Sequence, residues 1–178
     1  MAGVTAVPLM AIVDVIGTGV TPANVIFQAG SSFNYGTQAA GSTTPQVFTL
    51  ENTGGTDATL MTPSALVAPF DYVGGVFPGG AGDCGPILAA GATCTVEIEY
   101  SPPALGAHNI AYTMSYNDGL VARNATINLF GVGATPALLT INRAPQYDYG
   151  PHPVNATISQ TFTVTNTGGV QASAVADG

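Results

Sequence analysis

The two cysteines are the residues with the clearest potential for chemistry. Cys84 and Cys94 enclose a short loop rich in glycine and alanine, residues 85–93. Three interpretations stay open: a structural disulfide, two reduced thiols, or a metal or redox site. Two thiols without a nearby histidine cannot complete the four-ligand shell of structural zinc. If the thiols form a bridge, loop closure stabilises the fold by about 2.5–3 kcal/mol in the chain-entropy model.

The histidines and acidic residues do not form a catalytic pattern. His108 and His152 lie at unrelated positions, and we expect both to be exposed polar residues. No serine has the strand–turn–helix context that a Ser-His-Asp hydrolase needs. Calcium near Asp118 or Asp148 is the one metal alternative, but the closely spaced acidic loop typical of such sites is missing. We therefore predict no catalytic residue, no metal and no cofactor, and a protein that is not an enzyme.

A glycine-rich segment, residues 74–82, is the best candidate for a contact loop. It contains no lysine and precedes no predicted helix, so it cannot cradle phosphates as a P-loop does. Phe77 in this segment and the nearby Tyr72 are expected to be exposed. Aromatic side chains in surface loops often anchor sugars or proteins. The loop therefore carries the prediction of a glycan or protein contact.

Charge and hydropathy exclude two classes of partner. The chain has two arginines, no lysine and ten acidic residues, and its formal net charge is -8. Such a chain repels nucleic acid and anionic lipid. The most apolar stretch, residues 4–16, is interrupted by Pro8 and Asp14 and is shorter than the ~18–20 residues that span a bilayer. We expect neither nucleic-acid binding nor membrane insertion.

An internal repeat predicts the domain organisation. Residues 17–23 recur as residues 131–137, and residues 48–55 recur as residues 162–169, both at an offset of 114 positions. A repeat of this length suits one β-sandwich domain. The phase of the repeat divides the chain into three parts: residues 1–20, the last strand of a preceding unit; residues 21–134, a complete unit; and residues 135–178, the first strands of a following unit. We expect either a piece of a longer protein or a subunit that lends strands to neighbours.

Short alternating strands predict the fold class. Cys94, Val96, Ile98 and Tyr100 alternate with polar residues, which marks a strand with one buried face. Asn-Asp-Gly at residues 117–119 is a strong hairpin signal. Seven strands are placed, near residues 24–28 with a continuation at 33–36, and near 48–51, 57–61, 66–73, 94–100, 110–116 and 121–130. This pattern predicts an all-β protein of seven-stranded immunoglobulin-like sandwich repeats in tandem.

The order of these motifs resembles that of a known family. The motifs are Phe-Thr-Leu-Glu-Asn-Thr-Gly-Gly at 48–55, Pro-Phe at 69–70, the segment from Cys84 to Cys94, Tyr-Ser-Pro-Pro at 100–103 and Leu-Phe-Gly-Val-Gly at 129–133. Together they resemble the Ig-like repeats of bacterial choice-of-anchor D proteins, which are related to the abnormal-spindle/hydin type. The resemblance implies a seven-stranded sandwich, a large secreted or surface-anchored bacterial parent, a bridge between Cys84 and Cys94, and no catalytic activity.

Three functions compete at this point. The first is a structural or adhesive repeat module that acts as a spacer, with neighbouring Ig-like repeats of the same or adjacent chains as partners. The second is a filament subunit that assembles by strand exchange, although the two partial units together are shorter than one repeat. The third is a carbohydrate- or protein-binding module that uses Phe77, with a surface glycan or protein as partner. All three place the chain outside the cell or on its surface.

Overall fold

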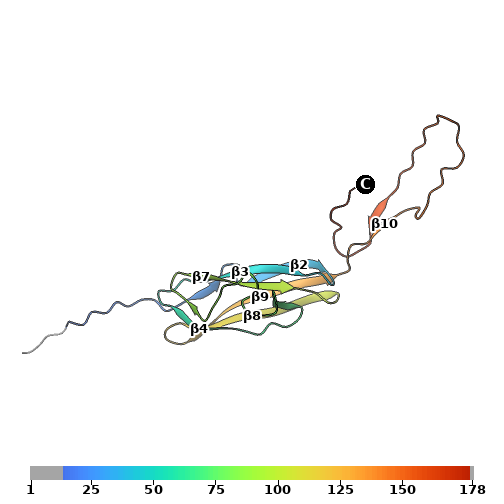
Figure 1. Cartoon of the computed structure of the whole chain (residues 1–178). Coiled ribbons are helices and arrows are strands. Elements are labelled where there is room, and N and C mark those ends of the chain that lie inside the picture. Colours follow the sequence, from blue (N-terminus) through green and yellow to red (C-terminus); the bar gives the residue numbers. More distant parts are fainter. Residues whose placement is uncertain (1–13, 177–178) are drawn as a thin grey trace, which may run out of the picture.

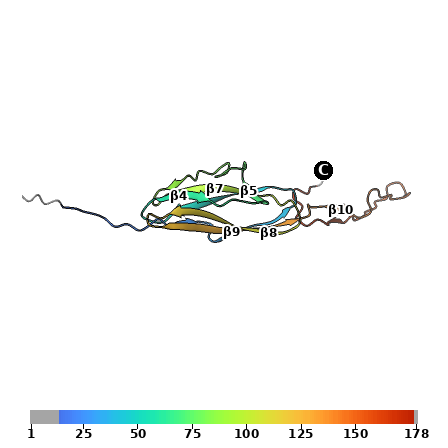
Figure 2. The same cartoon turned by 90° about the horizontal axis from the view of Figure 1, so that it is seen from below.

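Two β-sheets form the sandwich in the computed structural model, which describes residues 14–176. Figure 2 shows the two layers, with β7 and β5 in one and β8 and β9 in the other. The first sheet has the strand order β1 (Val25–Phe27), β3 (Thr44–Asn52), β7 (Thr93–Tyr100) and β5 (Phe70–Tyr72). The second has the order β2 (Ser32–Ala39), β9 (Ala122–Ala134), β8 (Gly106–Asn117), β4 (Ala58–Pro63) and β6 (Ile87–Leu88).

The alternation read from the sequence decides which face of each central strand is buried. In β7 the side chains of Cys94, Val96, Ile98 and Tyr100 are buried, and the residues between them are only half-buried. In the β8–β9 hairpin Tyr112, Met114 and Tyr116 are buried, as expected, while Ile110 is half-buried. A period of two places one set of side chains between the sheets and leaves the other outside. The prediction of an all-β Ig-like sandwich is therefore confirmed.

The number of strands differs from the prediction. Within residues 14–176 the sandwich has nine strands instead of seven. The predicted first strand and its continuation are two strands in different sheets, because the chain crosses over at Gly30. There β1 pairs antiparallel with β3, whereas β2 pairs parallel with β9. The other missed strand, β6, is too short to show a pattern in the sequence.

Aromatic rings join the two sheets. Tyr35 of β2 packs against Phe70, at 5.9 Å between ring centroids, and against Tyr100, at 5.5 Å. Its hydroxyl group donates a hydrogen bond of 2.8 Å to the backbone oxygen of Ile98 in β7. Burial raises the pKa of this hydroxyl group, and the negative charge of Glu99 adds to the effect. The ring therefore stays neutral and holds β2 against the opposite sheet.

The segments on either side of the sandwich are extended. Residues 14–24 contain no strand, and the predicted last strand of a preceding unit lies partly in residues 1–13, outside the described part of the chain. After β9, residues 135–176 form one further strand pair, β10 (Leu139–Ile141) with β11 (Val164–Asn166) (Figure 1). The three predicted unit boundaries stay predictions. No helix within residues 14–176 is long and apolar enough to cross a membrane.

Candidate functional site

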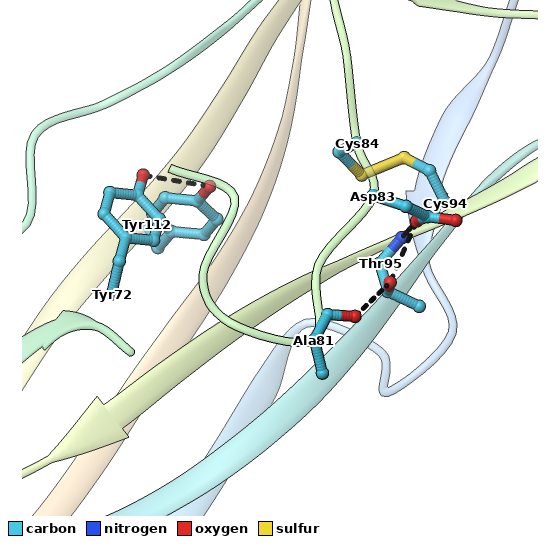
Figure 3. The surroundings of a disulfide bond; sticks show 7 residues. All are labelled: Tyr72, Ala81, Asp83, Cys84, Cys94, Thr95 and Tyr112. Carbon is cyan, nitrogen blue, oxygen red and sulfur yellow. Dashed lines mark hydrogen bonds between the residues drawn. A yellow bond between two sulfur atoms is a disulfide. The ribbon is translucent and has the colours of Figure 1, made fainter. Parts of the chain in front are cut away.

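Cys84 and Cys94 form a disulfide, which selects the first of the three interpretations. The bridge joins the segment before β6 to the start of β7, with the two Cα atoms 4.9 Å apart. Both sulfur-bearing residues are buried at the edge of the core. Next to the bridge the Asp83 carboxylate accepts hydrogen bonds from the Thr95 backbone N–H, at 2.6 Å, and from the Thr95 hydroxyl, at 2.9 Å (Figure 3). These two bonds lower the pKa of Asp83 and fasten the same loop a second time.

The expected exposure of the aromatic pair in the glycine-rich loop is wrong for Tyr72 and only partly right for Phe77. Tyr72 belongs to β5 and is buried in the core, where its hydroxyl group lies 3.3 Å from that of Tyr112 (Figure 3). Phe77 is half-buried and packs edge-on against Tyr72, at 5.6 Å between ring centroids. The ring of Phe77 in the loop is therefore packed on a ring of the core and does not project freely into solvent. A partner contact at this loop stays a prediction without exposed rings to support it.

Each of the two histidines hydrogen-bonds within the protein. His108 is half-buried rather than exposed, and its Nδ1 lies 2.8 Å from the hydroxyl group of Tyr100. His152 hydrogen-bonds to the backbone oxygen of Tyr149. Within residues 14–176 no group of three or more His, Cys, Asp or Glu side chains is arranged to hold a metal ion.

Asp118 organises the β8–β9 turn. Its Oδ1 accepts hydrogen bonds from the backbone N–H groups of Leu120 and Val121, and its Oδ2 lies 2.9 Å from Nε of Arg123. The Val121 N–H, the Arg123 guanidinium and the Leu120 N–H lower the pKa of this buried carboxyl to about 2. Both oxygens are therefore occupied by the protein itself. The carboxylate of Asp118 is thus engaged in holding the turn.

The carbonyl group of the same residue anchors the start of the unit. The backbone oxygen of Asp118 accepts a hydrogen bond from the Ala23 N–H, at 2.9 Å, and another from the Thr56 hydroxyl, at 3.2 Å. The turn thus closes over the entry of the chain into the sandwich. We call this place, where residues 21–24 meet residues 52–56, the joint.

Asn52 is the centre of the joint. It is fully buried at the end of β3, and its Oδ1 accepts hydrogen bonds from the N–H groups of Asn24 and Gly54. Its Nδ2 donates to the carbonyl oxygens of Thr56, Leu88 and Ala89, at 2.8, 3.1 and 3.3 Å. The sequence Asn-Thr-Gly-Gly at residues 52–55 is typical of a turn and does not by itself predict these contacts. The recurrence of this asparagine at position 166 was the signal for a larger role.

The same joint forms a second time, 114 residues further along the chain. Asn166 Oδ1 accepts hydrogen bonds from the N–H groups of Leu138 and Gly168, and its Nδ2 donates to the oxygen of Val170. The backbone N–H of Gly169 donates to the oxygen of Thr135, as that of Gly55 does to Thr21. Each of these bonds joins two residues whose equivalents, 114 positions earlier in the chain, are joined in the first joint. Residues 135–138 and 166–170 therefore reproduce the local hydrogen bonding of residues 21–24 and 52–56.

The glycines of the two joints show how tight they are. A Cβ atom on Gly54 would lie 2.2 Å from the backbone oxygen of Pro22, and one on Gly168 would lie 2.1 Å from that of Pro136. No side chain fits at such a distance. The backbone segments touch directly at both places, which explains why glycine recurs at this position.

Comparison with known proteins identifies the family. The model of the HYDIN/CFA65/VesB-like Ig-like domain matches residues 26–131, so the chain belongs to this family. The resemblance to hydin-type repeats is confirmed. No curated protein sequence matches the chain.

The chain is similar to parts of solved structures. The VesB protease of Vibrio cholerae superposes with a TM-score of 0.50 at 17% identity, over 62% of this chain and 32% of that one. The PapD-like domain 7 of human CEP192 superposes with a TM-score of 0.47 at 19% identity, over 74% of this chain and 99% of that one. The chain thus spans about a third of the length of VesB. At 17% identity the likeness to VesB is one of fold alone.

Proposed function

We propose that this chain is a non-catalytic structural module of a large secreted or surface-anchored bacterial protein, in which Ig-like units follow one another directly and act as a stiff spacer. The observation that carries the proposal is the joint. β9 ends at Ala134, and the next residue, Thr135, already accepts the hydrogen bond from Gly169 that opens the second joint. No residue is left between them as a free linker.

The chemistry of the connector supports stiffness. Pro136 has a fixed φ and no backbone N–H, so the residue before it is restricted as well. On the sandwich side, Gly131 and Gly133 of β9 lie against Tyr100 and the backbone of Ala104. A strand that is packed on one side and enters a tight joint on the other has few torsions left for bending.

The disulfide and the composition support an extracellular setting. Disulfides persist in oxidising compartments and are rare in the cytosol of mesophiles. A chain with few charges and many threonine, alanine and glycine residues suits a module whose partners are its neighbours of the same kind. Because an extended array needs no pocket, the same features fit an adhesive stalk as well.

The spacer role is tested with a chain that carries residues 21–134 twice in direct succession. This arrangement reproduces the connector, because residues 135–137 repeat the sequence of residues 21–23. The longest strand, β9, has 13 residues, and at ~3.3 Å per residue it is about 43 Å long. Small-angle scattering is expected to show a rod at least about twice that length, and spin labels on the two units are expected to give one narrow distance distribution.

The matched control carries a short Gly/Ser insertion between the two units. The insertion is expected to broaden the distance distribution and to reduce the mean length of the particle, since Gly/Ser linkers behave as flexible coils. If the direct fusion and the control gave equally broad distributions, the spacer proposal would be refuted.

A further inference from the structure

The strand pair β10–β11 carries an uncovered apolar face. Tyr149 is 44% exposed, whereas its equivalent in the complete unit, Tyr35, is 6% exposed. Val164 is 55% exposed, whereas its equivalent, Leu50, is fully buried. The same contrast holds at three more pairs of positions: Leu139 with Val25, Ile141 with Phe27, and Phe162 with Phe48.

The aromatic arrangement on this face is already that of the complete unit. Tyr147 packs edge-on against Tyr149, at 5.0 Å between ring centroids, and against Phe162, at 5.6 Å. The equivalent distances from Phe33 are 5.0 Å to Tyr35 and 5.2 Å to Phe48. The rings therefore take their packed arrangement without the groups that cover them in the first unit.

The complete unit shows which groups those are. Phe70 of β5 and Tyr100 of β7 cover Tyr35, and Tyr112 of β8 covers Phe27. Beside the rings of residues 135–176 there is instead a hollow of about 260 Å³, lined by Ile141, Tyr147, Tyr149 and Phe162 among others. The apolar part of this lining suits aromatic side chains, while Arg143 lies over the ring of Tyr147, at 5.1 Å from its centroid.

A second hollow lies at the second joint. It measures about 350 Å³ and is lined by Thr135, Pro136, Ala137, Leu138, Thr167 and Gly168. In the first joint the equivalent residue of Ala137, Ala23, donates its backbone N–H to the oxygen of Asp118. Within residues 14–176 the N–H of Ala137 has no acceptor. The β8–β9 turn of a sandwich unit would supply one.

We propose that the apolar face of residues 135–176 is a docking surface for a further Ig-like unit, which contributes strands equivalent to β5, β7, β8 and β9. Aromatic side chains of these strands occupy the first hollow. In the second hollow, the carbonyl group of the β8–β9 turn accepts a hydrogen bond from the Ala137 N–H. The proposal rests on the proposed function and deepens it by naming the partner of the second joint. The argument is the internal repeat itself, because equivalent residues in the first unit are covered by these strands.

The test supplies covering strands from this chain's own sequence. In the complemented chain, residues 1–169 are followed by residues 56–134, so that Thr56 follows Gly169 as it follows Gly55 in the first unit. Hydrogen exchange of the amides in β10 and β11 is compared between the natural and the complemented chain. We expect exchange to slow at least about 100-fold on complementation, since these amides then open only with a cooperative unit.

Phe162→Ser provides the matched control. In the natural chain Phe162 is partly exposed, and the substitution is expected to leave the melting temperature of the sandwich unchanged. In the complemented chain it is expected to abolish the protection of β10 and β11. The amides of β3 and β7 report in every case whether the first unit is folded.

A second variant covers the case in which the complemented chain does not fold. In this variant residues 135–169 replace residues 21–55 within the complete unit, so that they face the existing β5, β7, β8 and β9. A folded sandwich with a single melting transition is expected. Exchange in the complemented chain that equals that of the natural chain, together with an unfolded replacement variant, would overturn the proposal.

A different occupant would also be visible. If the natural chain alone formed oligomers in sedimentation experiments, and β10 and β11 became protected in them, the occupant would be a second copy and the proposal would be wrong. A flexible connector in the duplicated chain would refute the spacer role but would leave the exchange result intact. The two failures are therefore distinguishable.

Discussion

Replacing Asn52 by alanine is the sharpest test of the joint. The side chain is fully buried and makes five hydrogen bonds, two as acceptor and three as donor. Alanine removes all five and leaves the buried carbonyl oxygen of Leu88 in β6 and the half-buried groups at the chain entry without this partner. Among the described residues, each buried polar side-chain atom has a partner in the native protein. The substitution breaks that condition at one place.

The expected cost follows from the number of orphaned groups. An ordinary hydrogen bond contributes about 1 kcal/mol net, and an unsatisfied buried group costs about 1–3 kcal/mol. Four of the bonds are between 2.8 and 3.1 Å long, and the longest, to Ala89, is 3.3 Å. We therefore expect Asn52→Ala to lower the free energy of unfolding by about 3–5 kcal/mol. This is a large part of the ~5–15 kcal/mol that stabilises a typical domain.

The assay is urea denaturation at neutral pH, followed by far-UV circular dichroism. Asn166→Ala is the matched control, because Asn166 makes the equivalent bonds to Leu138, Gly168 and Val170 but is exposed. The control is expected to leave the unfolding midpoint of the sandwich unchanged. If Asn52→Ala also left the midpoint unchanged, or if both variants shifted it equally, the assignment of Asn52 as the centre of the joint would be refuted.

Three more results are expected. Reduction of the Cys84–Cys94 bridge is expected to lower the melting temperature, since the bridge closes a loop worth about 2.5–3 kcal/mol, while the sandwich stays folded at room temperature; equal melting curves with and without reductant would contradict this. The pKa of Asp118 in the folded protein lies at about 2, below its value in the unfolded chain, so the contribution of this carboxylate to the free energy of unfolding is present above pH ~4 and is lost as the pH falls towards ~2. Between these pH values the urea midpoint of Asp118→Asn should therefore fall less than that of the natural chain. Parallel curves of midpoint against pH would refute the role of this carboxylate. Gly131→Ala places a Cβ atom 2.5 Å from the ring of Tyr100 and should lower the free energy of unfolding by about 1–3 kcal/mol through overpacking. Gly17→Ala, at the equivalent position with open space around it, should leave the free energy of unfolding unchanged. An equal effect of both substitutions would disprove the packing argument.

The buried faces of the strands could be predicted because alternation is a local property. Val96, Ile98 and Tyr100 were assigned to the core from spacing alone, and they lie there. The expected position of Tyr72 was wrong because its strand, β5, has only three residues and pairs with β7 from the edge of the sheet. A strand of that length shows no periodicity, so its burial depends on what the opposite sheet brings to it.

For the joint, the sequence predicts only that its residues recur later in the chain. The recurrence of Asn-Thr-Gly-Gly at residues 52–55 and 166–169 is visible in the sequence, but its meaning is not. Asn52 acquires its role from the carbonyl oxygens of β6 and the chain entry from residues 21–24, which lie far away along the chain. Contacts between distant segments are set by the crossover between the sheets, and composition does not encode them.

The sequence by itself determined the all-β class, the alternation of the long strands, the family resemblance and the period of the repeat, because each depends on neighbouring residues or on comparison of the chain with itself. Only the tertiary structure decided that the crossover at Gly30 sends β1 and β2 into different sheets, that Tyr72 and Phe77 pack on each other, and that the turn at Asp118 closes the first joint. The physical reason is that burial and hydrogen-bond partners belong to the space between two sheets, which exists only after the chain has folded.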